Sequence, residues 1–490
     1  MNPTRDKQDK EMVLTFDLGT TRLKVAAFDL KGVLLGQVAI RNTDYSEDNL
    51  RWQNSEEWWQ NCITGVSELI SIHQLDLNKL RGISLSGRAG SCVFLDSDGQ
   101  VIANPWSDNR HNPQLQALLQ ENLHANLQDK LPLYAASIMA KYLWMRSNQP
   151  ETARNTRHLL YAKDFLLYKL CGKFVTDPAS SADSLQWQSG ILKKHNIDES
   201  LLPEIQLPWT IAGTTHATSA SALNCPVNIP VAVGGHDGIC ANTGAGAIDE
   251  NQFTITLGTH SVVRAIAMNQ PENSLRFYGY PPDKHVIGGN ALMAGRSLDW
   301  FVDNWFSISE DERQQTFAKL DQAASLIPPG SRGIKFLPYL SGQLAPEKST
   351  DARATFYGLG INHNRDDMFR AVLEGSGFAL CRIFNQVINW VGEPVSIGVT
   401  GSGVLSRTLT QIIADVLQRP LSITDASSEG RGAAMFCTVA LGIHENINDA
   451  AGTMIIENDK VEPNTDLSTT YANLLDEWVH FSRAIRNLEA

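Results

Sequence analysis

Residues 13–21 read Val-Leu-Thr-Phe-Asp-Leu-Gly-Thr-Thr, a short run with β-strand character that ends in one glycine and two threonines. The apolar runs that follow are separated by a Lys-Gly turn, so residues 13–35 predict a β-meander. Residues 253–261, Phe-Thr-Ile-Thr-Leu-Gly-Thr-His-Ser, repeat the order of strand, Gly-Thr turn and strand. This recurrence predicts two halves with duplicated folds.

Between the halves, an apolar strand at 229–233 runs into the glycine-rich turn Gly234–Gly238. We place a domain boundary after it and expect domains at 12–249 and 250–490. Helical spacing of apolar residues predicts helices at Ser55–His73, Asp366–Val387 and Ser406–Leu417. Strands mixed with such helices favour an α/β architecture.

The composition excludes several classes of protein. The chain has 490 residues, 42% of them hydrophobic, which is enough for large cores and argues against disorder. Its net charge of −12 argues against broad binding to nucleic acid or to an anionic membrane. The seven cysteines are scattered, no apolar run has the length of a membrane span, and the charged residues 1–11 lack a signal-peptide core. We expect a cytoplasmic protein with a disordered N-terminal extension.

Two Gly-Thr turns are candidates for binding phosphate. Gly19, Thr20 and Thr21 can present backbone N–H groups and hydroxyl groups to phosphate oxygens, and Gly258 and Thr259 stand at the matching place in the second half. A plain hairpin turn is the alternative for either one alone. Two such turns could hold a polyphosphate from both sides.

Two carboxylates and a third glycine-rich turn are further candidates. Asp237 follows an apolar strand between glycines and could accept a proton from a hydroxyl nucleophile, or could cap the next segment. Asp17, beside the first Gly-Thr turn, could hold Mg²⁺ or act as a structural cap. The turn at 399–403 leads from a strand to a helix and could admit a nucleotide base or ribose. Neither Walker-A spacing nor a GxGxxG motif follows the first strand.

Taken together, these motifs resemble those of the FGGY carbohydrate kinases, which are ATP-dependent sugar and polyol kinases of the actin-like ATPase superfamily. The resemblance extends from about Val13 to the 440s and is most specific at Ala354–Leu359 and Asp367–Glu374, which together are similar to the family's second signature. Trp106–Arg110 is similar to the family's WxDxR motif, and Gln411–Val416 to one of its helices. Within the family, the chain resembles the xylulokinase-like branch.

The resemblance implies a fold of two duplicated actin-like, ribonuclease H-like domains around a central cleft. It implies that Asp237 is the general base and that Mg²⁺ arrives with ATP. We expect Asp17 to hold this ion. It further implies nucleotide contacts at Gly19, Thr20, Thr21, Gly258, Thr259, Gly295, Asp299, Gly401, Ser402, Gly403 and Ser406. A homodimer is expected by analogy with the family alone.

The chain departs from the family where substrate is read. Gly87–Ser91 matches neither the QMHG string of xylulokinases nor the Arg-Glu pair of glycerol kinases, and Ala136 replaces a glycerol kinase tyrosine. Arg88, Asp108 and Arg110 could bind substrate hydroxyl groups or pair with one another. Ser402 interrupts a glycine triplet, and His260 replaces a small residue. The identity of the sugar therefore stays open.

We expect an ATP-dependent phosphotransferase acting on a hydroxyl group of a small sugar or polyol, such as a ketopentose, with Arg88, Asp108 and Asp237 at the substrate. A deoxy-sugar kinase is an alternative. Two further rivals are a sugar sensor that kept the scaffold with weakened activity and an actin-like ATPase that acts on protein partners.

Overall fold

Two β-sheets with matching strand order organise the chain, and each belongs to its own compact unit. The computed structural model describes residues 10–88, 90–123, 133–181, 189–258, 261–271, 276–280, 283–291, 295–343, 345–349, 351–424, 427–457 and 459–489. Of these, the first unit takes the residues up to 244, those from 278 to 283 and those from 429 to 455. The second unit takes the rest.

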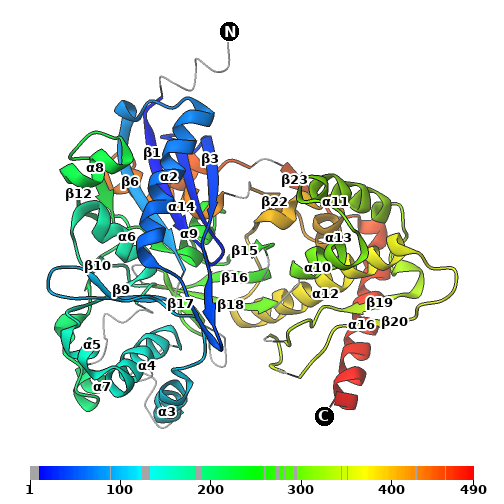
Figure 1. Cartoon of the computed structure of the whole chain (residues 1–490). Coiled ribbons are helices and arrows are strands. Elements are labelled where there is room, and N and C mark those ends of the chain that lie inside the picture. The colour runs from blue at the N-terminus through cyan, green and yellow to red at the C-terminus, as the bar shows by residue number, and fades with distance from the viewer. Residues whose placement is uncertain are drawn as a thin grey trace. The chain divides into compact units, whose positions relative to one another are not determined.

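The first unit is built on a sheet with helices packed against it (Figure 1). Its strands are β1 (Met12–Leu18), β2 (Arg22–Asp29), β3 (Leu34–Arg41), β4 (Tyr45–Glu47), β5 (Leu50–Trp52), β6 (Leu80–Gly87), β7 (Cys92–Leu95), β8 (Val101–Ala103), β9 (His158–Tyr161), β10 (Val175–Thr176), β11 (Glu204–Ile205), β12 (Ile211–Thr214), β13 (Pro230–Ala232) and β14 (Gly235–His236). Its helices are α2 (Ser55–His73), α3 (Asn112–Leu123), α4 (Leu133–Asn148), α5 (Pro150–Asn155), α6 (Ala162–Cys171), α7 (Ser189–Lys194), α8 (Ala217–Leu223), α9 (Asp237–Gly244), α14 (Ser428–Ala440) and α15 (Ile447–Met454).

The main sheet of this unit runs in the order β12-β13-β6-β1-β2-β3, and β14 also pairs with β6. β1 is antiparallel to β2 and parallel to β6. Because side chains alternate between the two faces of a strand, every second residue of β1 enters the same core. Leu14 and Phe16 pack there with Trp58 of α2 and Phe165 of α6.

The other face of β1 is covered by α14 and α15. Val13 and Phe28 pack with Met435 of α14 and Met454 of α15. Thus β1 is buried on both faces, which explains why all seven of its residues are buried. A strand buried on both faces needs an element on each side, and the chain supplies the second one from far along the sequence.

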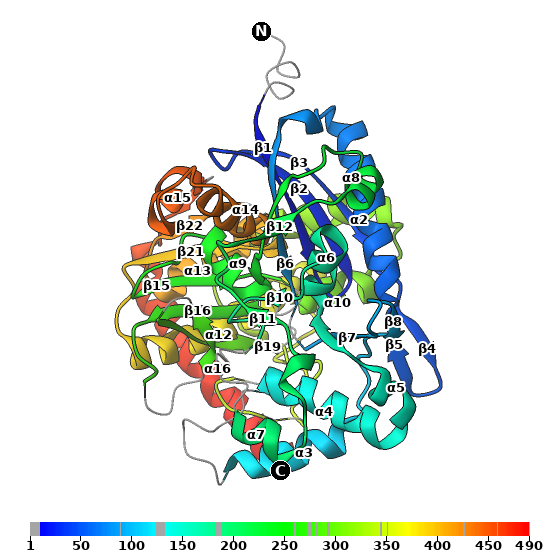
Figure 2. The same cartoon turned by 90° about the vertical axis from the view of Figure 1, so that its left-hand side faces the viewer.

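The structure divides the chain differently from the two continuous domains expected at 12–249 and 250–490, because residues 429–455 pack with the first unit. Figure 2 shows α14 beside α9. A Cβ at Gly432 of α14 would lie 2.0 Å from the carbonyl oxygen of Cys240 in α9, so the two helix backbones touch at this point.

The second unit repeats the plan of the first. Its elements are β15 (Gln252–Thr256), β16 (Ser261–Ala267), β17 (Arg276–Tyr280), β18 (Lys284–Ala291), α10 (Arg296–Trp305), α11 (Glu310–Ser325), β19 (Lys335–Leu337), β20 (Thr355–Tyr357), α12 (Arg365–Val391), β21 (Ser396–Thr400), α13 (Arg407–Leu417), β22 (Leu421–Ile423), β23 (Asp459–Val461) and α16 (Ser468–Glu489). The sheet order is β17-β18-β16-β15-β21-β22-β23.

The predicted duplication is confirmed by strand pairing. β15 is antiparallel to β16 and parallel to β21, as β1 is to β2 and β6. The long helix α12, yellow in Figure 1, packs against β16 and β18. Its Phe384 meets Phe253 of β15 in the core, with ring centroids 5.0 Å apart.

Local signals set the helix ends. α2 spans the predicted residues, because the side chain of Asn54 accepts a hydrogen bond from the Glu56 amide at its start and Gln74 is left-handed at its end. α12 and α13 are also present, with ends shifted by at most four residues from the prediction. In the described part of the chain, every helix is too short or too polar to cross a membrane.

Candidate active site

Three parallel strands of the first unit end at the same edge of the sheet. In the register of β1 with β6, Leu18 pairs with Gly87, and in the register of β14 with β6, His236 pairs with Gly87. The residues that follow these strands are Gly19, Arg88 and Asp237. Parallel strands place their carboxyl ends together, so the pairing brings the first Gly-Thr turn, Arg88 and the candidate base to one place.

The first Gly-Thr turn, residues 19–21, is held by its carbonyl oxygens. Arg88 donates to the first carbonyl oxygen at 2.7 Å, Gln53 to the second at 3.0 Å, and the backbone amide of Asn42 to the third at 2.9 Å. The side chains of Thr20 and Thr21 are exposed. Because the carbonyl groups are bound by the protein, the turn is fixed with its threonines toward solvent.

Asp17 lies at the end of β1 and has two neighbours. Its Oδ1 accepts a hydrogen bond from the hydroxyl of Ser86 at 2.8 Å, and its Oδ2 lies 3.3 Å from the Nζ of Lys24. Lys24 also donates to Glu429 of α14 at 3.3 Å. Burial raises the pKa of Glu429. For Lys24, burial favours a lower pKa, but the negative charges of Glu429 and Asp17 outweigh this effect, so its pKa is raised. Sequence reasoning missed Lys24, although the hairpin register places it opposite Asp17.

Asp237 is the first residue of α9, and its side chain is 38% exposed. The tight turn before it requires glycine at 234, where φ is +68° and a Cβ would lie 2.0 Å from the carbonyl oxygen of Leu85. His236 Nδ1 accepts a hydrogen bond from the Gly238 amide at 3.0 Å. That bond assigns the proton of the neutral imidazole to Nε2, which lies 3.2 Å from Oδ1 of Asp237.

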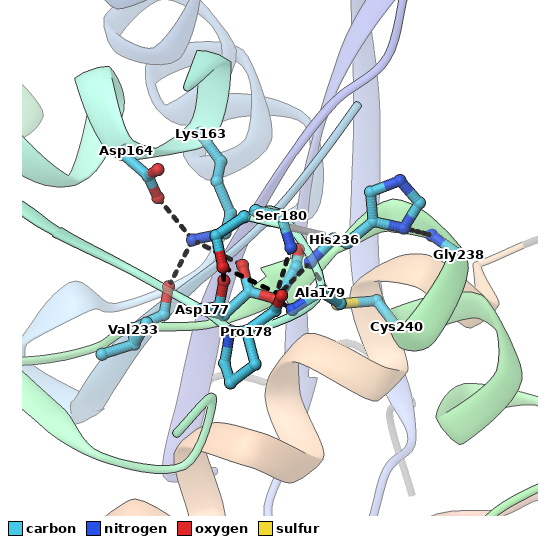
Figure 3. Close-up of polar contacts among 12 residues, drawn as sticks. Lys163, Asp164, Asp177, Pro178, Ala179, Ser180, Val233, His236, Gly238 and Cys240 are labelled. Atoms are coloured by element: carbon cyan, nitrogen blue, oxygen red, sulfur yellow. Dashed lines mark hydrogen bonds and ion pairs between the residues drawn. The ribbon is translucent and has the colours of Figure 1, made fainter. Parts of the chain in front are cut away.

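A buried group of ions lies under this turn (Figure 3). Lys163 Nζ lies 2.5 Å from Asp164 and 3.1 Å from Asp177, and it donates to the carbonyl oxygen of Val233 at 3.4 Å. The side chains of all three ions are at most 1% exposed. Asp177 Oδ2 accepts the backbone amide of His236 at 3.4 Å, so the group is bonded directly to the strand that precedes Asp237.

The two carboxylates of this group differ in their partners. Burial raises the pKa of Asp164, which has Lys163 as its main counter-charge. Burial would also raise the pKa of Asp177, but Lys163 and hydrogen bonds from Ser180 lower it. Burial would lower the pKa of Lys163, but the two carboxylates raise it. One ammonium group therefore lies between a carboxylate whose charged form is favoured, Asp177, and one whose charged form is disfavoured, Asp164.

A cavity of about 310 Å³ opens in the first unit next to the turn. Hydrogen-bonding side chains and one aromatic ring form most of its wall, among them Thr20, Gln53, Arg88, Trp106, His111 and Lys141. This mixture of donors, acceptors and a flat apolar surface is typical of a site for a small polyhydroxylated ligand.

Two cations line this cavity: Lys141 is buried and Arg88 is half-buried. Lys141 is 4% exposed and donates to the backbone carbonyl oxygens of Gly90 and Trp106 at 2.7 and 2.9 Å. Burial lowers its pKa. Burial also lowers the pKa of Arg88 to about 10, against the opposing effect of Asp44 and Asp237. Burial and the charge of Lys141 lower the pKa of His111 to about 4, so this ring is neutral at pH 7.

The predicted substrate residues Arg88 and Asp108 are placed differently. Arg88 lines the cavity, whereas Asp108 lies outside its lining and pairs with Arg110, which donates from Nε at 2.7 Å. Burial would raise the pKa of Asp108, but hydrogen bonds from Arg110 and the Arg51 amide hold it at about 2. This favours the ion-pair interpretation of Asp108.

The second unit contains its own cavity, of about 360 Å³. Predicted nucleotide residues line it, together with apolar side chains such as Phe317; these residues are Gly258, Gly295, Asp299, Ser402 and Gly403. Thr259 and His260 lie outside the described residues, as does Ala89 of the first unit. The cavity combines a small-residue wall with an apolar wall.

Glycine is required at 401, where φ is +95° and a Cβ would lie 2.4 Å from the carbonyl oxygen of Leu257. Ser406 is buried and does not line the cavity. Its hydroxyl group donates to Asp321 and accepts the Leu409 amide at 3.0 Å, which makes it the N-cap of α13. Asp299 accepts a hydrogen bond from Arg313 at 2.9 Å at the cavity wall.

Comparisons with known proteins agree with the fold of both units. The model described as the FGGY family of carbohydrate kinases, N-terminal domain, matches residues 12–244, and the model for the C-terminal domain of that family matches residues 254–441. The chain is 27% identical to xylulose kinase of Bacillus subtilis over 95% of both chains. It is 25% identical to gluconokinase of Bacillus licheniformis over 97% of this chain and 96% of the other.

A solved structure has the same fold. The crystal structure of ligand-bound xylulose kinase from Lactobacillus acidophilus matches with a TM-score of 0.84 at 22% identity, over 97% of this chain and 98% of the other. The strands β15, β16 and β21 repeat the arrangement of β1, β2 and β6, and this duplication belongs to a known fold.

Proposed function

Because the chain belongs to the FGGY family of carbohydrate kinases, we propose that it transfers the terminal phosphoryl group of ATP to a hydroxyl group of a small ketose or polyol, with Asp237 as general base. The chain is a phosphotransferase with an alcohol group as acceptor, and ATP is its co-substrate. The observation that carries the proposal is the strand register that places Asp237, Arg88 and the first Gly-Thr turn at one sheet edge.

In the proposed reaction, the carboxylate of Asp237 takes the proton from the sugar hydroxyl group as its oxygen attacks the γ-phosphorus in line. A new O–P bond forms, the bond to the β-phosphate oxygen breaks, and ADP leaves. His236 supports this role, because its Nε2–H at 3.2 Å leaves the second carboxylate oxygen of Asp237 for the substrate proton.

The nucleotide is proposed to bind through both Gly-Thr turns. Gly19, Thr20 and Thr21 would bind phosphate oxygens from the first unit, and Gly258 with Thr259 from the second. The cavity of the second unit supports an adenosine site at Gly295, Asp299, Ser402 and Gly403, which line it. Gly401 is proposed for the same site because it directly precedes Ser402. For Ser406 we propose that it holds the helix behind this site, since its side chain is buried.

The residues fit a magnesium ion that arrives with ATP. Among the described residues, no group of three or more His, Cys, Asp or Glu side chains could hold a metal by itself. Mg²⁺ on a nucleotide needs only one or two carboxylates and keeps several waters, so the single carboxylate of Asp17 suits it. When bound, Mg²⁺ would neutralise charge that develops on the transferring phosphoryl group.

A sugar acid is the second candidate substrate. Lys141 is buried in the wall of the first cavity, and its two described hydrogen bonds go to backbone carbonyl groups rather than to a carboxylate. A carboxylate on the substrate would supply the counter-charge. The similarity to a gluconokinase also favours this class. A cytoplasmic location and a homodimer stay predictions.

The test is ADP release in a coupled assay with Mg-ATP against ketoses, aldoses, polyols and aldonates. We expect one substrate class to stimulate ADP release, with the largest effect from a compound that carries a primary hydroxyl group. If aldonates alone stimulate ADP release, the substrate is a sugar acid and not a neutral sugar. Bound ATP with no stimulation by any compound would contradict the kinase assignment and favour the sugar-sensor alternative.

A further inference from the structure

We propose that Arg88 and Gln53 are positioning residues that join the sugar cavity to the first Gly-Thr turn, so that nucleotide phosphates and the sugar each favour binding of the other. The proposal rests on the proposed function, because it takes the turn as a phosphate site and the cavity as a sugar site. Both side chains line the cavity, and both donate to the turn.

Arg88 uses every part of its guanidinium group in this connection. Nη1 donates to the carbonyl oxygens of Gly19 and Thr20 at 2.7 and 3.1 Å, and Nη2 donates to Gln53 Oε1 at 2.8 Å. Nε donates to the hydroxyl of Ser91, a residue of the cavity wall, at 3.0 Å. The group therefore cannot move toward a ligand without changing a bond to the turn.

Gln53 is fixed in one orientation by four bonds. Its Oε1 accepts hydrogen bonds from Arg88 and from the Trp58 indole at 2.8 and 3.0 Å. Its Nε2 donates to the carbonyl oxygen of Thr20 at 3.0 Å and to Asp44 at 2.7 Å. Trp58 is 1% exposed, and the guanidinium carbon of Arg88 lies 5.0 Å from its ring centroid. A displacement of Arg88 therefore changes the bond of Gln53 to the turn, and a displacement of the turn changes the bond of Gln53 to Arg88.

The consequence for the turn follows from peptide geometry. Where Arg88, Gln53 and Asn42 hold the carbonyl oxygens inside the protein, the turn is kept from rotating its peptide groups. The Gly19 amide donates to the carbonyl oxygens of Asp17 and Arg22 at 3.2 and 3.1 Å, so the turn would offer the amides and hydroxyl groups of Thr20 and Thr21 to an anion. Donors that are placed in advance bind phosphate without a further ordering cost. Burial of the guanidinium group strengthens these bonds, because water screens them less.

Coupling between the two sites is then reciprocal. A sugar that binds Gln53 or Arg88 restrains them, and thereby restrains the turn; bound phosphate restrains the same side chains from the other side. If the sugar raises the affinity for nucleotide by some factor, nucleotide raises the affinity for sugar by the same factor, typically about 5- to 150-fold.

The experiment compares Arg88→Met with Arg81→Met. Arg81 lies on β6, the strand that Arg88 follows, but is exposed and pairs with Glu11 at 2.6 Å, so its replacement controls for the loss of one arginine. Calorimetry measures binding of Mg²⁺ with the non-hydrolysable analogue AMP-PNP, and of AMP, without sugar. For Arg88→Met we expect affinity for AMP-PNP to fall about tenfold or more, with affinity for AMP within about twofold of the wild type. Arg81→Met should bind both as the wild type does.

Equal losses for AMP-PNP and AMP in a folded Arg88→Met variant would show a general structural defect and overturn the proposal, as would unchanged affinity for AMP-PNP. If Arg88→Met fails to fold, Gln53→Met removes one bond to the turn without removing a charge, and the same split between AMP-PNP and AMP is expected. Inactivity of the wild type toward all sugars would refute the proposed function while leaving the AMP-PNP result to decide the role of Arg88.

A second arm tests coupling with the sugar that best stimulates ADP release. In the wild type this sugar should raise the affinity for AMP-PNP about fivefold or more, and in Arg88→Met the factor should fall toward one. A factor that is the same in both proteins would overturn the coupling through Arg88.

Discussion

Replacement of Lys163 by methionine tests the buried ions under the turn that carries Asp237. The change keeps the length of the side chain and removes the charge that lies 2.5 Å from Asp164 and 3.1 Å from Asp177. Both carboxylates are fully buried, so they would face each other without a cation. Breaking a buried ion pair by removing one partner costs about 3–5 kcal/mol, which corresponds to a fall in Tm of roughly 6–20 °C for a unit of this kind.

The loss should depend on pH, because the two carboxylates respond differently. Asp177 keeps the hydrogen bonds that the backbone amides of Ala179 and Ser180 donate to it at 3.0 and 3.1 Å, and these bonds favour its charged form. Asp164 loses its counter-charge and takes up a proton in the folded state. A carboxyl group whose folded pKa is raised reduces stability as pH rises above its unfolded pKa of about 3.9. The deficit of Lys163→Met should therefore be largest near neutral pH and shrink toward pH 4.

The assay is thermal unfolding of the wild type, Lys163→Met and Lys163→Met/Asp164→Asn between pH 4 and pH 7. Lys169→Met is the matched control, because Lys169 lies on the same helix but pairs with Glu56 at the surface at 2.8 Å, a contact worth about 0–1 kcal/mol. The double variant should recover part of the lost Tm. A single variant as stable as Lys169→Met, or a deficit that grows toward pH 4, would refute this reasoning about the buried charges.

Two other changes test the second cavity and the Asp108 ion pair. Gly401→Ala would place a Cβ 2.4 Å from the carbonyl oxygen of Leu257 at a φ of +95°, so the affinity for ATP, measured by calorimetry, should fall about tenfold or more. The control Gly452→Ala, with no atom within 4 Å of its Cβ, should bind ATP as the wild type does. Equal affinities of the two variants would contradict the account of the turn at Gly401. Asp108→Asn should lower Tm at pH 6, and the difference in Tm from the wild type should shrink from about pH 5 to pH 3. The reason is that Asp108 has a pKa of about 2 in the folded state and about 3.9 in the unfolded state. A difference in Tm that does not depend on pH would argue against the pair with Arg110.

The parts of the fold that sequence could predict are those with local causes. The Gly-Thr hairpins, the strand before Gly234 and the helix at Ser55–His73 follow from apolar spacing, turn glycines and the capping residue Asn54. The duplication was also visible, because each half carries its own copy of the same strand and turn.

Contacts between distant segments could not be predicted from local patterns. The packing of α14 on β1 depends on which elements cover a strand that is buried on both faces, and the pair of Lys24 with Glu429 depends on the same packing. For the same reason, the expected domain of residues 250–490 did not anticipate that residues 429–455 join the first unit.

The candidate site shows the same division. Asp237 and the turn at 19–21 could be proposed from the residue types that follow a strand. Gln53 and Lys141 could not, because amide and ammonium groups enter the cavity from segments without a distinctive motif of their own. For Ser406 the nucleotide contact stays a prediction, and its hydroxyl group caps α13, a role that its residue type alone did not distinguish from ligand binding.

The most direct test of the central claim is the rate of phosphoryl transfer by Asp237→Asn with the sugar that best stimulates ADP release. Loss of the base predicts a fall in kcat of roughly 10²–10⁴-fold, while the Kd for Mg-ATP stays within about threefold of the wild type. Asp98→Asn, at an exposed turn, should keep full activity. A kcat within tenfold of the wild type for Asp237→Asn would contradict the assignment of Asp237 as the group that takes the proton.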